Sequence, residues 1–168
     1  RQPEGRRWDY ARLGWNYRPS EYLAALLSVR LRHLEAETRR RAANAEYLGS
    51  RLREIPGVTP PSTASWVTLH GYHLYAMKVD SAHFGGRSRD EIVAALSAEG
   101  IPSTAGYETP LSEQAALVHL AKKYPDLMRV EPYPNASAVC RTSIWTYQNI
   151  LLAERKDMDD VVEAFAKV

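Results

Sequence analysis

The chain has 168 residues, of which 45% are hydrophobic and 25% charged, values that are ordinary for one globular domain and exclude disordered and collagen-like classes. Its net charge of +2 does not mark a nucleic-acid binder, and no apolar run approaches the roughly 18 residues of a membrane-spanning helix. The single cysteine, Cys140, excludes an intrachain disulfide and a zinc site built on several cysteines. Because no signal segment is visible either, we expect a cytoplasmic protein.

The first half of the sequence predicts an arm followed by a long helix. Residues 1–18 have no initiator methionine and are rich in arginine, glycine and aromatic residues, so they are interpreted as the start of a chain that has been cut or as a segment entering from something upstream. Pro19 and Ser20 supply a helix start, and apolar residues then recur at spacings of three and four up to about Ile55. Such a helix would be roughly 50 Å long at 1.5 Å per residue. Because a domain of this size cannot cover it alone, we expect it to contact another domain or another subunit.

The second half predicts short strands alternating with helices. In chain order the expected elements are a strand near 72–79, a helix from a Ser88–Glu91 capping box to Gly100, an extended segment at 101–107, a helix at 112–123, a turn at 132–134, a strand at 142–145 and a last helix capped by Asp157. This order predicts an α+β domain with a small, largely antiparallel sheet and helices packed on one side.

Residue spacing reveals little catalytic chemistry. His70 and His73 are expected on opposite faces of a strand, which is a poor arrangement for one metal ion, so no metal site is predicted. Cys140 is interpreted as a buried structural thiol. The five lysines fit surface positions, and none has the surroundings of a Schiff-base lysine.

One segment stands out, because Gly14, Asn16, Tyr17 and Arg18 lie together just before a helix start. Backbone N–H groups at a helix start favour an anion, and amide and guanidinium groups are good donors to one. The segment therefore indicates a site for a phosphate or a polar ligand. The alternative is an arm whose aromatic residues attach it to a core.

Together with the helix behind it, this segment resembles the DegT/DnrJ/StrS family of pyridoxal-phosphate-dependent aminotransferases, which act on keto-sugars and keto-cyclitols. The matching stretches are Gly14-Trp15-Asn16-Tyr17-Arg18, Ser20-Glu21 with Ala24-Ala25, Arg41 and Tyr47, His73-Leu74-Tyr75, Arg89-Asp90-Glu91, Glu99-Gly100-Ile101, Tyr107 with Pro110-Leu111, and Asp157-Met158-Asp159-Asp160-Val161. The resemblance covers residues 13–168. Residues 144–149 resemble the branch that acts on cyclitols or aminoshikimate-type rings, with packing in the core as the alternative for Trp145 and Tyr147.

The resemblance implies that the chain is the C-terminal part of a fold-type I aminotransferase. Residues 1–18 would be an arm from the missing large domain, 19–56 a connecting helix and 57–168 the small domain. An amino group would pass from glutamate or glutamine to the keto-sugar or keto-cyclitol. The cofactor lysine would lie upstream, so this chain would contain no catalytic residue and be inactive alone.

The resemblance also assigns roles to individual residues in a homodimer. Asn16 would reach the phosphate of the neighbouring subunit's pyridoxal 5'-phosphate, and Tyr17, Arg18 and Tyr107 would contact the substrate. The family often has Pro-Leu-His after the tyrosine loop, whereas this chain has Ser112 at the third position, so no substrate-contacting histidine is carried over.

Two alternative functions remain open from the sequence. The chain could be a non-catalytic relative of this fold that acts as a regulatory or interaction domain. It could instead bind nucleic acid through Arg6, Arg7 and residues 39–41, although a solvated helix face is the expected role of that arginine run.

Overall fold

The computed structural model describes residues 17–168, in a chain that divides into two units, Arg1–Leu34 and Glu35–Val168. Helix α1 (Glu21–Leu52) begins in the first unit, after Ser20. The Ser20 carbonyl accepts a hydrogen bond from the Ala24 amide at 2.9 Å, and its hydroxyl accepts one from the Leu23 amide at 3.4 Å. The helix start predicted at Pro19 and Ser20 is therefore correct, because the serine side chain satisfies an amide that the first turn leaves unpaired.

The described part of the first unit exposes a set of apolar side chains on α1. They are at least half exposed and comprise Leu23, Leu26, Leu27, Val29, Leu31 and Leu34. A lone helix of this length contributes little stability in water, since most helical stability in proteins comes from packing of an apolar face.

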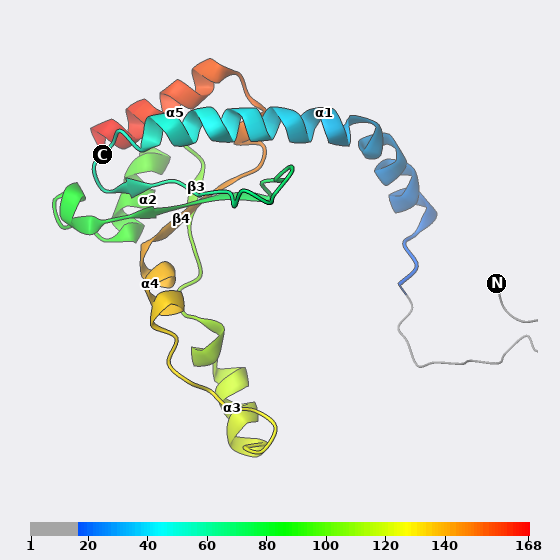
Figure 1. Ribbon diagram of the computed structural model, residues 1–168, viewed down its shortest axis with the longest axis vertical. Helices are drawn as coiled ribbons and strands as arrows, with labels where there is room; N and C mark the ends of the chain where they lie inside the picture. Colours follow the sequence, from blue (N-terminus) through cyan, green and yellow to red (C-terminus); the bar gives the residue numbers. More distant parts are fainter. Residues whose placement is uncertain (1–16) are drawn as a thin grey trace, which may run out of the picture. The chain divides into compact units, whose positions relative to one another are not determined.

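The second unit is built on a four-stranded antiparallel sheet with strand order β1-β2-β4-β3 (Figure 1). The strands are β1 (Val58–Thr59), β2 (Leu74–Val79), β3 (Ser103–Ala105) and β4 (Ser143–Tyr147). The helices are α2 (Arg89–Ala98), α3 (Ala115–Lys123), α4 (Pro134–Thr142) and α5 (Arg155–Lys167), with short 3-10 turns at Ser81–Phe84, Leu111–Glu113 and Ile150–Leu152. The predicted α+β class with a small antiparallel sheet is confirmed.

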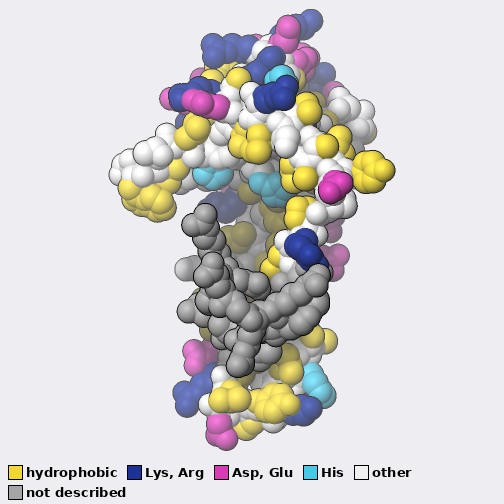
Figure 2. All heavy atoms as spheres, turned by 90° about the vertical axis from the view of Figure 1, so that its right-hand side faces the viewer, with side chains coloured by type: hydrophobic (Ala, Val, Ile, Leu, Met, Phe, Trp, Pro, Cys, Tyr) yellow, Lys and Arg dark blue, Asp and Glu magenta, His cyan; other side chains and the backbone are white. Residues whose placement is uncertain are grey.

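The arginine run on α1 is largely engaged within the chain. Arg39 pairs with Glu35 at 2.7 Å, and Arg40 donates to the carbonyl oxygen of Ala153 at 2.9 Å. Arg41 is buried, so the expectation that all three side chains form a solvated face is wrong at this position. Basic and acidic side chains are also interspersed on the face of the molecule in Figure 2.

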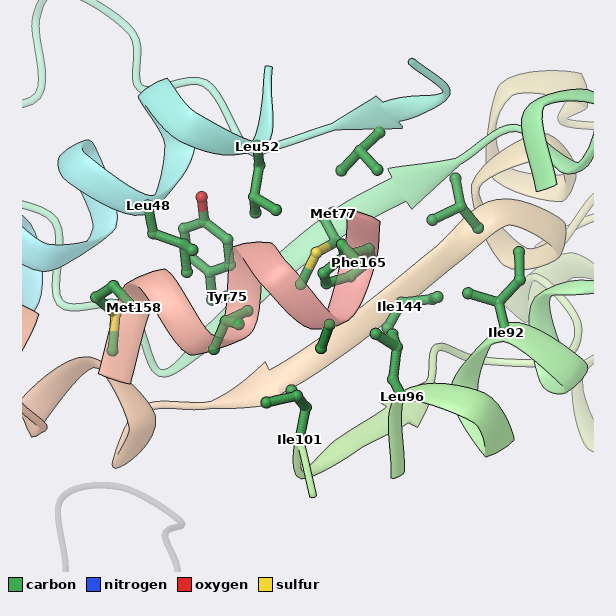
Figure 3. Close-up of a cluster of buried hydrophobic side chains, with 14 of the residues drawn as sticks. Leu48, Leu52, Tyr75, Met77, Ile92, Leu96, Ile101, Ile144, Met158 and Phe165 are labelled. Atoms are coloured by element: carbon green, nitrogen blue, oxygen red, sulfur yellow. The ribbon is translucent and has the colours of Figure 1, made fainter. Parts of the chain in front are cut away.

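The core lies on one face of the sheet, under the second half of α1 and under α2 and α5 (Figure 3). Alternation along the strands puts Tyr75 and Met77 of β2 and Ile144 of β4 on this face. Leu48 of α1 and Phe165 of α5 pack against them. Burial raises the pKa of the Tyr75 hydroxyl far above its usual value.

Polar side chains join α1 to the end of the chain. The buried Asn44 amide donates to the carbonyl oxygens of Leu151, at 2.9 Å, and Ala153, at 3.0 Å. The Tyr47 hydroxyl donates to the carboxylate of Asp159 at 2.6 Å, and this hydrogen bond raises the tyrosine pKa. These contacts explain why an asparagine and a tyrosine occur among the apolar positions of this helix.

The local structure departs from the sequence prediction at three places. Residues 134–142 form helix α4, because Pro134 takes the first helical position, where a proline costs no hydrogen bond, rather than completing a turn. Strand β1 escapes prediction because two residues carry no alternation pattern. Helix α5 is capped by Glu154, and Asp157 occupies the third helical position, where its carboxylate accepts from the Glu154 amide at 2.7 Å.

His70 and His73 lie before β2 rather than within a strand, so the argument from strand alternation does not apply to them. Tyr72 between them has a φ of 47°, a left-handed conformation that interrupts any extended run. The His70 ring accepts a hydrogen bond from the Tyr72 amide at 2.9 Å. Within residues 17–168, no helix is long and apolar enough to cross a membrane.

Candidate functional site

The first group of candidate residues lies at the start of α1. Tyr17 is 85% exposed, and Arg18 is exposed as well. Asn16, the predicted cofactor contact, lies outside the described residues. An exposed phenol and a guanidinium beside a helix start are able to bind an anionic or polyhydroxylated ligand.

The second group surrounds Tyr107, which follows β3. The Tyr107 side chain is 72% exposed, and its ring meets the indole of Trp145 edge-on, with centroids 5.0 Å apart and planes at 86°. Trp145 belongs to β4, where it pairs with Ala76 on one side and Thr104 on the other. Its side chain therefore lies on the sheet face opposite the core, and Tyr107 is presented on that face.

Gly106 brings the tyrosine loop into close contact with β4. Its amide donates to the carbonyl oxygen of Ser143 at 3.0 Å. A side chain at this position would have its Cβ 2.0 Å from the Ser143 hydroxyl and 3.2 Å from the Trp145 indole. The absence of a side chain is thus what lets the loop backbone lie against the sheet.

Arg89, the first residue of α2, also contacts the tyrosine loop. Its guanidinium donates to the carbonyl oxygens of Cys140 and, at 3.4 Å, Tyr107, while Nε pairs with Asp90 at 2.9 Å. The arginine side chain is only 9% exposed. It links the end of α4, the start of α2 and the tyrosine loop.

A capping box fixes the helix start that carries Arg89, as the sequence predicts. The Glu91 carboxylate accepts from the amide and the hydroxyl of Ser88, both at 2.7 Å, and the Ser88 hydroxyl accepts from the Glu91 amide at 3.3 Å. These hydrogen bonds from Ser88 hold the pKa of Glu91 below its usual value.

The loop continues into a 3-10 turn that begins after Pro110. Gln114 donates to the Thr109 hydroxyl at 2.8 Å and closes the turn. The Ser112 hydroxyl, at the position where the resemblance expects a histidine, is buried without a hydrogen-bond partner in the described part of the chain. Leu111 next to it is 75% exposed.

The structure describes Tyr17 and Arg18 in one unit and Tyr107 in the other, so each group of candidate residues is described by itself. It adds Gly106, Arg89 and Trp145 to the surroundings of Tyr107. The core interpretation of Tyr147 is wrong, because this side chain is 55% exposed on the same sheet face as Trp145. Alternate residues of a strand lie on opposite faces of the sheet. The period-two pattern of residues 143–147 therefore assigns Trp145 and Tyr147 to the face opposite Ile144.

Metal-ligating side chains and lysines are two further kinds of candidate site residue within the described part of the chain. No group of three or more metal-ligating side chains occurs among residues 17–168. All five lysines of the sequence fall in this range, and each is exposed. Lys167 pairs with Glu99 at 3.1 Å, which raises the lysine pKa, whereas a Schiff-base lysine needs a lowered one.

The model of the DegT/DnrJ/EryC1/StrS aminotransferase family matches residues 1–166. An L-glutamine:2-deoxy-scyllo-inosose aminotransferase of Streptomyces fradiae is 30% identical over 165 residues, covering 93% of this chain and 39% of that protein. A Streptomyces kanamyceticus protein, provisionally assigned as an L-glutamine:3-amino-2,3-dideoxy-scyllo-inosose aminotransferase, is 34% identical over 93% of this chain and 40% of its own length.

Solved structures show the same fold. A 3-amino-5-hydroxybenzoic acid synthase superposes with a TM-score of 0.76 at 20% identity, over 98% of this chain and 42% of that one. DesV of S. venezuelae superposes with a TM-score of 0.71 at 26% identity, over 96% of this chain and 40% of that one. The chain therefore spans about 40% of the length of the curated relatives it matches.

Proposed function

Because the chain belongs to the DegT/DnrJ/EryC1/StrS aminotransferase family, we propose that it works as the C-terminal part of a longer aminotransferase. The observation that carries this proposal is the family match over residues 1–166, combined with a span of about 40% of the curated relatives. The arm would then be residues 1–18, the connecting helix residues 19–56 and the small domain residues 57–168.

The proposed reaction moves an amino group from glutamine to the ketone carbon of a cyclitol. The relatives named above support this choice, since their names give L-glutamine as donor and a scyllo-inosose as acceptor. Within the same reaction class, glutamate is the alternative amino donor and a keto-sugar is the alternative acceptor. The exposed phenol of Tyr107 is suited to an acceptor rich in hydroxyl groups, because it both donates and accepts hydrogen bonds.

The proposed cofactor is pyridoxal 5'-phosphate, which supplies an electron sink for amino-group transfer when bound. Asn16 would donate to its phosphate across a homodimer, and Tyr17 and Arg18 would contact the substrate. The exposed guanidinium of Arg18 fits a carboxylate or phosphate group. The lysine that holds the cofactor would lie upstream, since the surroundings of the five lysines here do not fit that role.

The proposal also gives the exposed apolar residues of α1 a partner. We assign them to contact with the large domain or the second subunit, because apolar surface of this kind marks protein–protein contacts. Homodimerisation and a cytoplasmic location are parts of the same proposal.

The test compares the 168-residue chain with the longer protein. Each is mixed with pyridoxal 5'-phosphate, glutamine and 2-deoxy-scyllo-inosose, and the aminated cyclitol is measured by mass spectrometry. We expect turnover by the longer protein and none by the isolated chain. Turnover by the isolated chain would contradict the proposal, as would a longer protein inactive with both keto-cyclitols and keto-sugars.

A regulatory role is the second candidate, and one relative favours it. The erythromycin biosynthesis sensory transduction protein EryC1 of Saccharopolyspora erythraea is 32% identical over 114 residues, 68% of this chain and 27% of that protein. A non-catalytic relative would lack the visible absorbance of a lysine-bound cofactor. The absorbance spectrum of the longer protein therefore separates the two candidates.

A further inference from the structure

The Tyr107 ring contacts one aromatic neighbour among the described residues and is otherwise largely exposed. Its edge-to-face contact with Trp145 is its one ring contact among the described residues, and 72% of its surface is open to solvent. Gly106 before it cannot move away from β4 without losing the hydrogen bond to Ser143. The backbone of the loop is thus attached to β4 at Gly106 and to Arg89 at the Tyr107 carbonyl oxygen, whereas the tyrosine ring depends on Trp145 for its orientation.

Trp145, by contrast, is set in the middle of the sheet. Strand β4 is paired on both edges, with β2 and with β3, so its backbone has no free edge at this point. The indole is half-buried, and it lies against the position that a Gly106 side chain would occupy. An edge-to-face contact is directional, so a fixed indole favours one orientation of the ring that meets it.

We propose that Trp145 is a positioning residue that orients the Tyr107 side chain toward the amino acceptor and so determines how well the acceptor fits. This inference rests on the proposed function, because Tyr107 is its predicted substrate contact. Trp145 would act through Tyr107 and would not touch the acceptor. The donor step is the half of the reaction in which glutamine gives up its amino group, and it does not use the acceptor. The rate of this step should then be insensitive to substitution of Trp145.

The experiment is a double-mutant cycle in the longer protein, with Trp145→Ala, Tyr107→Ala and the pair. The donor step is followed with glutamine alone, from the absorbance change of the bound cofactor, and acceptor use is followed as KM and kcat for 2-deoxy-scyllo-inosose. An aromatic pair of this geometry predicts a rise of about three- to tenfold in acceptor KM for Trp145→Ala. The donor rate should stay within about twofold, and in the Tyr107→Ala background the tryptophan substitution should have no further effect.

Two further variants make the cycle specific. Trp145→Phe keeps an aromatic face for Tyr107 and should recover most of the acceptor KM. Tyr147→Ala removes an exposed aromatic side chain from the same strand and the same face, and it should leave both steps unchanged.

The outcomes separate this inference from the function on which it rests. If the wild-type protein shows no donor step, the proposed function fails and the inference fails with it. If the donor step is normal but the two substitutions are additive, Trp145 acts independently of Tyr107 and only the inference is overturned. A loss of the donor step in Trp145→Ala would also overturn it, because that result indicates a general structural role.

Discussion

Arg41 and Gly71 are joined by a 3.0 Å hydrogen bond from the guanidinium Nε to the backbone carbonyl oxygen, across thirty residues of chain. The same guanidinium donates to the Thr38 hydroxyl at 2.8 Å. Tyr72, which follows Gly71, adopts the left-handed conformation just before β2 begins. A buried arginine of α1 thus holds the turn that leads the chain into the sheet.

Arg41→Lys should destabilise the second unit, because an ammonium group cannot reproduce the forked geometry that serves both acceptors. The expected loss is about 1.5–3 kcal/mol in the free energy of unfolding, measured by urea denaturation. Arg51→Lys is the matched control, since Arg51 lies on the same helix with an exposed side chain. Equal stability of the two variants would contradict the assigned role of Arg41.

The capping box of α2 should make the protein sensitive to acid. Folding lowers the Glu91 pKa, so the charged carboxylate stabilises the folded state above the pKa of an unfolded glutamate, roughly 4.3. That contribution is lost as the pH falls through the lower folded pKa. Glu91→Gln keeps a hydrogen-bond acceptor but does not titrate, so its stability should decline less than that of the wild type between pH 6 and pH 3. Parallel declines would remove Glu91 as a source of the acid sensitivity.

Gly106→Ala should destabilise the loop that carries Tyr107, because the new methyl group meets the Ser143 hydroxyl and the Trp145 indole. Overpacking of this kind costs about 1–3 kcal/mol. Ser143→Ala removes the closest contact of the new methyl group. Gly106→Ala should therefore cost less stability when it is made in the Ser143→Ala protein than when it is made in the wild type. Thermal unfolding of all four proteins measures the coupling, and a strictly additive result would show that the two positions do not collide.

Asn16→Ala tests the proposed cofactor contact in the longer protein. Loss of a hydrogen bond to a charged phosphate costs about 1.5–3 kcal/mol, which corresponds to roughly a 10- to 100-fold rise in the dissociation constant of pyridoxal 5'-phosphate. Asn149→Ala, at an exposed asparagine of the second unit, should leave cofactor retention unchanged. Unaltered cofactor affinity in Asn16→Ala would remove this residue from the site.

Leu27→Glu should reduce self-association of the isolated chain. The apolar side chains of residues 21–34 are exposed when α1 lacks a partner, and a carboxylate among them opposes burial against a second molecule. Light scattering over a range of concentrations measures the effect. His33→Glu adds the same charge at a residue that is already polar and exposed, and it should change association less; equal effects would point to charge rather than apolar contact.

The sequence predicts elements well where local chemistry decides them. Ser20 and the Ser88–Glu91 pair mark helix starts because a side chain binds a free amide within three residues. Helix α4 escapes prediction because its proline is compatible with both a turn and a helix start, and the surrounding structure decides between them. The sequence predicts the cap of α5 at Asp157 rather than at Glu154, because the two residues form a reciprocal pair in which either acid could be the cap.

Only part of the candidate site can be predicted from the sequence. Tyr107 is singled out by the family resemblance, but its supports come from distant segments, with Arg89 on α2 and Trp145 on β4. Their meeting depends on the β3–β4 register, which pairs Thr104 with Trp145 and brings Gly106 next to Ser143. Local patterns do not contain such non-local pairings.

The attachment of the tyrosine loop bears on how this protein could be redesigned. Arg89 binds a backbone carbonyl oxygen, and at Gly106 the lack of a side chain lets the loop approach β4, so neither attachment depends on which side chains stand at positions 107 and 108. Thr109 differs, because its hydroxyl accepts the hydrogen bond from Gln114 that closes the next turn. A library that varies 107 and 108 and leaves 89, 106, 109 and 143 untouched would therefore change the exposed side chains of the loop on an unchanged backbone.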